Sequence, residues 1–137
     1  MKILLFCDFA LPDSCANATR VINFAKILRE LGHDIELLGV SYRGNEPLSG
    51  EYAGIPYQMI KAKEVYGIRA WERIRGIDAG LREFFSESNV AYDAILLSNI
   101  YFDHSGVVLQ YAKNNNTKLI FNSVEWYDNS HFKGVNG

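Results

Sequence analysis

Five short apolar runs along the chain are separated by stretches in which apolar residues recur at helical spacing. The runs predict strands over residues 3–7, 34–40, 55–62, 92–99 and 118–124. The first run, Ile3–Cys7, is apolar at every position, which is typical of a strand that is covered on both faces. Strands that alternate with helices predict an α/β domain with a Rossmann-like parallel sheet of about five strands and flanking helices.

The stretch between the first two strands predicts a helix. Its apolar residues recur at helical spacing from Ala18 to Leu31, and Gly32 is placed to end the helix. Asp13 or Ser14 is placed to cap the first turn. The resulting strand–helix–strand unit has the length that a right-handed parallel crossover needs.

Two further helices are predicted, over residues 69–88 and 104–113. The longer one has an apolar face, which consists of Trp71, Ile74, Ile77, Leu81, Phe84 and Phe85. Gly76 and Gly80 lie inside this helix, and because each costs about 1 kcal/mol relative to alanine, they predict close packing. Residues 41–54 are rich in Gly, Pro, Ser and Asn, which predicts a loop between the second and third strands.

The composition favours one folded domain over residues 1–137. Apolar residues make up 48% of the 137 residues, enough for a hydrophobic core. The formal net charge of −2 argues against a dedicated nucleic-acid-binding protein, which carries a basic excess. No apolar run approaches the ~20 residues of a membrane span, and the first run is too short for a signal peptide. We therefore expect a cytoplasmic protein.

The two cysteines, Cys7 and Cys15, do not form a recognisable metal-binding pattern. No CxxC pair and no Cys/His cluster accompanies them, so we expect no zinc site. In a cytosolic protein both are expected to be free thiols.

Basic residues concentrate in one part of the chain. Residues 61–82 hold six cations and three anions, and within residues 65–77 aromatic and aliphatic residues interleave with arginines. Arginines meet anionic lipids while a tryptophan such as Trp71 suits the interface, so peripheral contact with the inner face of a membrane is one interpretation. In the alternative, Trp71 and Ile74 pack in the core and the arginines form an ordinary solvated face.

The carboxyl ends of the strands are where parallel sheets bind ligands, and the first of them is the most informative. The loop "CDFALPDSCANATR" leads into the amino end of the first helix, where free N–H groups favour an anion. It has no GxGxxG pattern, which argues against an NAD site. The small residues Ser14, Ala16 and Ala18 replace glycine in this loop, so a ligand can still approach the backbone, although less closely.

Arg20 and Asn17 are the polar candidates on the first helix. Helical spacing places Arg20 at the edge of the apolar arc, between the directions of Phe24 and Ile27. It either pairs with a phosphate or carboxylate at the strand ends or covers apolar surface with its stem. Asn17 either donates to the same ligand or serves as a local cap.

The fourth and fifth strands also end in polar residues. Ser98, Asn99 and His104 follow the fourth strand, where His104 is a candidate base or a surface residue beside a helix cap. Glu125 and Trp126 follow the fifth strand; a carboxylate beside an aromatic ring suits a sugar, and the alternative is an aromatic core with a solvated Glu125. Weak catalytic candidates are therefore Asn99, His104 and Glu125.

The order of these segments resembles a known enzyme family. "MKILLFCDFALP", a small-residue turn, "NFAKILRELGHDIELLGV", "YDAILLSN" and "LIFNSVEWY" together resemble the N-terminal half of family-4 glycosyltransferases. The resemblance implies half of a GT-B architecture, with two Rossmann-like domains and a cleft between them. It also implies a retaining, metal-independent transfer of sugar from a nucleotide-sugar donor, without a cofactor, to a glycan or lipid-linked acceptor in cell-envelope polysaccharide synthesis.

The sequence departs from this family in three respects. Cys15 and Ala16 stand where many members have Gly-Gly, although a branch with an "xANxxR" turn is similar and implies donor-phosphate or acceptor contacts by Asn17 and Arg20. Ser98 and Asn99 stand where many members have a histidine. The donor-binding C-terminal domain, with its Glu-x7-Glu pair, is absent, so the chain is expected to be a truncated acceptor-side domain that is inactive alone. The alternative is a non-catalytic α/β module that docks on a separate catalytic subunit.

Overall fold

The computed structural model describes residues 1–12, 14–42, 47–62, 70–88, 90–98 and 105–122, and for residues 70–75 and 105 it describes the backbone only. These residues form six strands and three helices. Their bounds are β1 Lys2–Cys7, α1 Ala16–Glu30, β2 Asp34–Ser41, β3 Ser49–Tyr52, β4 Ile55–Lys61, α2 Ala70–Glu87, β5 Ala94–Ser98, α3 Ser105–Asn115 and β6 Lys118–Asn122.

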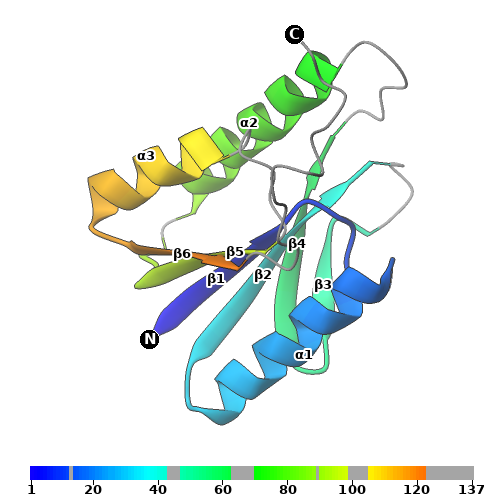
Figure 1. Ribbon diagram of the computed structural model, residues 1–137, viewed down its shortest axis with the longest axis vertical. Helices are drawn as coiled ribbons and strands as arrows, with labels where there is room; N and C mark the ends of the chain where they lie inside the picture. The colour runs from blue at the N-terminus through cyan, green and yellow to red at the C-terminus, as the bar shows by residue number, and fades with distance from the viewer. Residues whose placement is uncertain (13, 43–46, 63–69, 89, 99–104, 123–137) are drawn as a thin grey trace, which may run out of the picture.

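The strands form one sheet in the order β3-β4-β2-β1-β5-β6 (Figure 1). All neighbouring strands are parallel except β3, which pairs antiparallel with β4 at one edge. From β1 the chain first proceeds to β2 and β4, and then returns to add β5 and β6 on the other side of β1. The order of the strands therefore reverses between β1 and β5, which is the position where open α/β sheets bind ligands.

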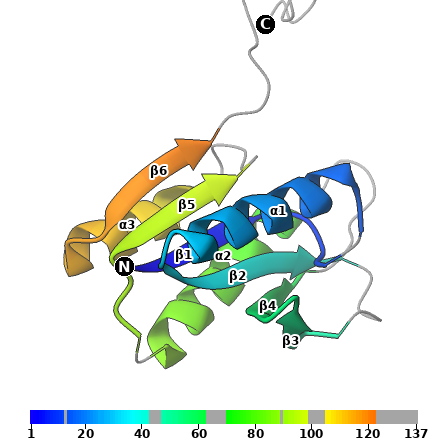
Figure 2. The same cartoon turned by 90° about the horizontal axis from the view of Figure 1, so that it is seen from below.

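The helices cover the two faces of the sheet unequally. α1 lies on one face, whereas α2 and α3 lie on the other (Figures 1 and 2). Alternate residues of each strand enter the two cores, so Leu5 and Leu37 pack with α1 while Leu4 and Leu38 pack with α2. The apolar runs identified in the sequence are continuous because each strand supplies both cores.

The five predicted strands and the predicted parallel α/β class are confirmed, with ends that differ by a few residues. The prediction that residues 41–54 form only a loop is wrong, because β3 lies within them. All four residues of β3 are exposed, so its sequence has no alternating apolar pattern and it is held by backbone pairing to β4. The three helices are also confirmed, and Gly32 has a φ of +85° just beyond the end of α1.

The loop between β1 and α1 packs against a glycine of the neighbouring strand. A Cβ atom added to Gly39 in β2 would lie 2.8 Å from the Phe9 carbonyl oxygen and 3.0 Å from Leu11 Cγ. The Val40 N–H donates to the same Phe9 oxygen at 3.0 Å, and Leu11 is buried. The loop itself contains no glycine, and the close approach that fixes it is made possible by Gly39.

Of the two glycines predicted to mark close packing in α2, one does so. A Cβ on Gly80 would lie 2.2 Å from Ile60 Cγ2, so α2 approaches β4 closely at that point. Nothing lies within 4 Å of a Cβ on Gly76, and the prediction for that residue is wrong. Gly76 lies on a part of the helix surface with open space.

A buried polar cluster lies beneath α2. The Tyr92 hydroxyl donates to Glu36 Oε2 at 2.7 Å, and Gln58 Nε2 donates to Glu36 Oε1 at 3.2 Å. Glu36 is only 9% exposed and Tyr92 only 3%, so the carboxylate depends on these donors for its solvation. Burial first, and then the hydrogen bond to Glu36, raise the pKa of Tyr92 well above its usual value.

Candidate functional site

A row of polar side chains crosses the carboxyl ends of three strands. The strand register places Cys7 of β1 beside Ser98 of β5, and Ser98 beside Asn122 of β6. All three positions lie on the α1 face, because residues alternate along each strand. Two residues earlier on each strand, and so on the same face, the register aligns Leu5, Leu96 and Ile120. The sheet surface between α1 and β6 therefore changes from apolar to polar towards its carboxyl edge.

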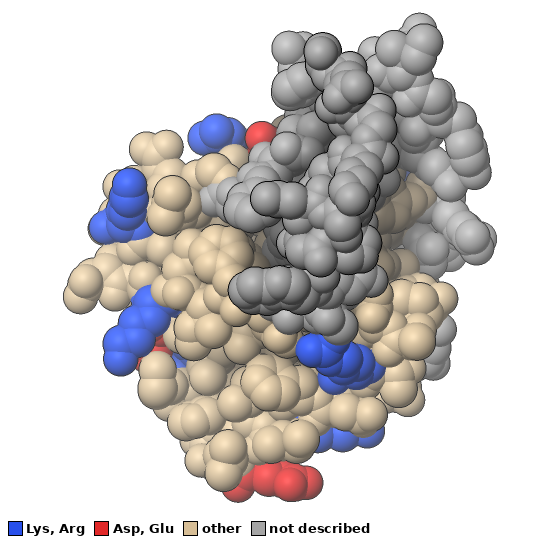
Figure 3. All heavy atoms as spheres, viewed as in Figure 1, with Lys and Arg blue, Asp and Glu red and all other residues tan. Residues whose placement is uncertain are grey.

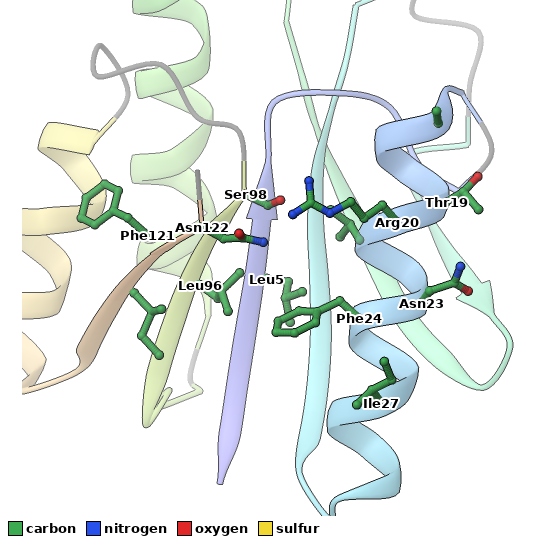
Figure 4. A pocket seen from close by; sticks show the side chains of 13 residues that line it. Leu5, Thr19, Arg20, Asn23, Phe24, Ile27, Leu96, Ser98, Phe121 and Asn122 are labelled. Atoms are coloured by element: carbon green, nitrogen blue, oxygen red, sulfur yellow. The ribbon is translucent and has the colours of Figure 1, made fainter. Parts of the chain in front are cut away.

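A cavity of about 680 Å³ lies between α1 and this surface (Figure 4). Its lining combines the amino end of α1, the exposed face of β5 and β6, and residues spaced along α1. The lining residues are Leu5, Ala16, Thr19, Arg20, Val21, Asn23, Phe24, Ile27, Leu96, Ser98, Ile120, Phe121 and Asn122. The cavity lies at the reversal of strand order, where the fold predicts a ligand.

Arg20 and Ser98 form the polar end of the cavity. Figure 4 shows the Arg20 side chain extending from α1 towards Ser98 and the end of β1. No described carboxylate forms a salt bridge with Arg20. Ser98 is only 3% exposed, and its hydroxyl has no hydrogen-bond partner among the described residues. A guanidinium and an unpartnered hydroxyl that converge on one point suit an anionic ligand with hydrogen-bond acceptors.

The first turn of α1 adds free backbone donors to this end. Its N-cap is Cys15, which makes no side-chain hydrogen bond to the helix. The predicted capping by Asp13 or Ser14 is wrong in position, because the N-cap lies one residue beyond Ser14 and the Ser14 hydroxyl donates to the Ala10 carbonyl oxygen. The amides at the start of the helix are therefore left for another acceptor.

The predicted site residues on the first loop and helix divide into two groups. Ala16 and Arg20 line the cavity, as their sequence positions suggested. Ser14, Cys15 and Asn17 are exposed near the same end of α1 but do not line the cavity. Arg20 has the expected direction, over the edge of the apolar arc and towards the strand ends (Figure 4).

Several predicted residues lie outside the described part of the chain. These are Asn99, His104, Glu125 and Trp126, together with residues 65–69 of the basic segment. The sequence analysis missed Asn122 and the apolar wall formed by Phe24 and Ile27. The signal for Asn122 was its register, since it stands two residues after Ile120 and so lies on the same face of β6.

The electrostatic setting of the cavity is mild. Burial raises the pKa of the neighbouring Cys7 thiol, which keeps it protonated and unreactive. Among the described residues, no group of three His, Cys, Asp or Glu side chains is arranged to hold a metal ion. Figure 3 shows the Lys and Arg side chains of the described residues spread singly over the part of this face that they form. None of the described helices is long and apolar enough to cross a membrane.

Comparisons with known proteins identify the fold. No protein-family model and no curated protein sequence matches the chain. Sucrose-phosphate synthase from Thermosynechococcus elongatus superposes with a TM-score of 0.65 at 14% identity, over 88% of this chain and 32% of that one. A second structure of part of that synthase gives a TM-score of 0.61 at 13% identity, over 90% of this chain and 64% of that one.

A protein with a different description is about equally similar. The C-terminal domain of a hydrogenase from Pyrococcus furiosus superposes with a TM-score of 0.63 at 16% identity, over 88% of this chain and 90% of that domain. At such identities the similarities establish a shared Rossmann-like fold. The chain spans about a third, 32%, of the whole synthase chain.

Proposed function

We propose that this chain is the acceptor-side domain of a glycosyltransferase that uses a nucleotide-sugar donor. The observation that carries the proposal is that Arg20 and Ser98 line the same end of the cavity, where the strand order reverses. The fold likeness to part of sucrose-phosphate synthase, a glycosyltransferase of the GT-B fold, supports the same interpretation. The order of segments that resembles family-4 glycosyltransferases is a third, separate support.

The chemistry of such a transfer suits the residues present. A nucleoside diphosphate leaves with negative charge, which the first-turn amides of α1 would stabilise, and Arg20 would pair with a phosphate of the donor or of the acceptor. The remaining contribution of this domain would be to hold the acceptor at the strand ends. Retention of configuration, independence from metal ions and the absence of a cofactor follow from the family resemblance and are part of the proposal.

The partners in this proposal are a donor-binding C-terminal domain and a sugar or lipid-linked acceptor of the cell envelope. The proposed location is cytoplasmic, at the inner face of the membrane, with residues 65–77 as the contact. Asn17, Glu125 and Trp126 remain proposed acceptor or donor-phosphate contacts, and Asn99, His104 and Glu125 remain the catalytic candidates. Nucleic acid is not a proposed partner.

The test is release of nucleoside diphosphate from UDP-, GDP- and ADP-sugars by the complete polypeptide that contains this domain, with envelope lipid extract as acceptor. We expect release from one donor, and a loss of kcat/KM on the order of a hundredfold for Arg20→Gln. Arg82→Gln is the matched control, because Arg82 is an exposed arginine of α2 on the opposite face. Absence of release from every donor, or equal activity of the two variants, would contradict the proposal.

The second candidate is a non-catalytic module that docks on a separate catalytic subunit. Ile120 is 48% and Phe121 is 60% exposed on the edge strand β6, which suits a protein partner at that edge. The hydrogenase C-terminal domain, at similar structural likeness, also indicates that this fold is not confined to transferases. In this case nucleoside diphosphate would be released only after the separate subunit is added.

A further inference from the structure

We propose that the cavity between α1 and β5–β6 binds the phosphate monoester of an amphiphile, with the phosphate at Arg20 and Ser98 and the apolar chain along Phe24, Ile27 and Ile120. This names the acceptor class for the function proposed above and takes its biological role from that function. Binding itself requires no catalysis, so it can be tested separately.

The polar end of the cavity has the donors that a phosphate needs. Arg20 supplies a charged fork without a described carboxylate partner. Ser98, a residue that is 3% exposed, supplies a hydroxyl that faces the cavity and has no partner among the described residues. Asn122 lies beside Ser98 in the strand register. A phosphate oxygen placed at this end would give the Ser98 hydroxyl an acceptor that the described residues do not supply.

The rest of the cavity is apolar and extends away from that end. Arg20, Phe24 and Ile27 follow one another along α1 at spacings of four and three residues, which places them on one face. Figure 4 shows Phe24 directed towards Leu5, with Ile27 one turn further along the helix. Ile27 lies seven residues after Arg20, a rise of about 10 Å along the helix, which is roughly the length of an extended eight-carbon chain.

The far side of this groove is formed by strand residues that no described helix covers. Leu96 is 6% exposed, but its cross-strand neighbour Ile120 is 48% exposed, and Ile27 opposite is 52% exposed. Right-handed crossovers explain this arrangement. The chain crosses the sheet in one direction from β1 to β2, which places α1 on one face. It crosses in the opposite direction to reach β5 and β6, which places α2 and α3 on the other face. Among the described helices, only α1 therefore borders the α1 face of β5 and β6.

A phosphate with an apolar chain is the ligand class that fits both ends. A free phosphate would leave Ile27 and Ile120 in water, and an uncharged lipid would leave Arg20 and Ser98 without partners. Each methylene that is removed from water contributes roughly fourfold in affinity. The groove is open on one side, so the gain per methylene should be smaller than this.

The experiment is calorimetric titration of the chain with ethyl phosphate, octyl phosphate and octyl glucoside, each below its micelle-forming concentration. We expect octyl phosphate to bind at least about tenfold more tightly than ethyl phosphate, and octyl glucoside to bind more weakly than octyl phosphate. Arg20→Gln should lower the affinity for octyl phosphate about tenfold, and the control Arg82→Gln should leave this affinity unchanged. Ile27 is at an exposed position that tolerates a polar side chain. Ile27→Ser should therefore reduce the ratio of the affinities for octyl and ethyl phosphate without changing the affinity for ethyl phosphate.

Equal affinity for ethyl and octyl phosphate would overturn the proposal, and so would Ile27→Ser and Ile120→Ser variants that both keep the full chain-length advantage. Vesicles of phosphatidylcholine with and without phosphatidic acid distinguish a membrane surface from a bound molecule. Binding to phosphatidic acid vesicles without binding to monomeric octyl phosphate would also overturn it. If octyl phosphate binds as expected but no nucleoside diphosphate is released from any donor, the amphiphile site stands and the transferase function fails. If nucleoside diphosphate is released but octyl phosphate does not bind, the transferase function stands and the amphiphile site fails.

Discussion

The sheet has two halves that differ in how they are covered. In the half formed by β1, β2 and β4, helices lie on both faces, and Leu5 and Leu37 on the α1 face are at most 1% exposed. In the half formed by β5 and β6, only the face towards α2 and α3 is covered by described helices, and Ile120 on the other face is 48% exposed. The first half is built for stability, and the second leaves a groove that a ligand can enter.

The contrast follows from the path of the chain and requires no special residue. Right-handed connections place α1 on one face as the chain moves from β1 to β2, and place α2 and α3 on the other face as the chain moves in the opposite direction to β5 and β6. What is special in the second half is the placement of Arg20 and Ser98 beside an otherwise apolar surface. The predictions below separate the structural half from the binding half.

Truncation of a core residue should have the largest effect. Leu37→Ala should lower the free energy of unfolding by about 2–5 kcal/mol, because it leaves a cavity between α1 and the sheet. Ile120→Ala in the open half should cost less than about 1 kcal/mol, since Ile120 is 48% exposed. Denaturation by urea measures both. Equal losses would mean that the two halves are packed alike.

The second largest effect on stability should come from Gly39, the glycine against which the loop between β1 and α1 packs. Gly39→Ala should cost about 1–3 kcal/mol, because its Cβ would collide with the Phe9 carbonyl oxygen. The matched control is Gly76→Ala in α2, where no contact occurs and the helix should gain up to about 1 kcal/mol. The two thermal melting points should therefore shift in opposite directions, and a shift in the same direction would refute the role of Gly39.

The buried hydroxyl beneath α2 should have a smaller, pH-dependent effect. Tyr92→Phe removes a donor from Glu36 and should cost about 1–3 kcal/mol at neutral pH. Because the pKa of Tyr92 is raised in the folded state, its contribution is fully present below the usual value of about 10 and is lost as the pH rises above it. The difference in unfolding free energy between the wild type and Tyr92→Phe should therefore narrow above about pH 10. A constant difference would exclude this coupling.

The smallest effect on stability should come from the binding half. Arg20→Gln should change the free energy of unfolding by less than about 0.5 kcal/mol, because Arg20 is exposed and has no described carboxylate partner. Arg82→Gln should behave in the same way. A large loss for Arg20→Gln alone would assign Arg20 a structural role.

The sequence predicted the five strands with apolar runs, including β5 and β6 of the open half, and it missed the exposed strand β3 at the opposite edge. Continuous apolar runs such as Ile3–Cys7 identified the parallel strands, because residues buried on both faces leave an uninterrupted apolar segment. β3 was missed because an exposed edge strand has no such signal. The direction of Arg20 was predictable from helical spacing. Its approach to Ser98 depends on how α1 packs across the sheet, and the spacing of residues within one helix gives no information on that packing.

The most direct test of the account is a map of the backbone amide NMR signals of the chain during titration with octyl phosphate. We expect the largest shifts at Ala16–Arg20, Ile27, Ser98 and Ile120–Asn122, which border the groove on the α1 face. The competing location is a second cavity of about 860 Å³ on the α2 face, bordered by Lys61 and Glu83. Shifts centred on that cavity, with the α1 groove unchanged, would contradict the assignment of the open half of the sheet as the binding half.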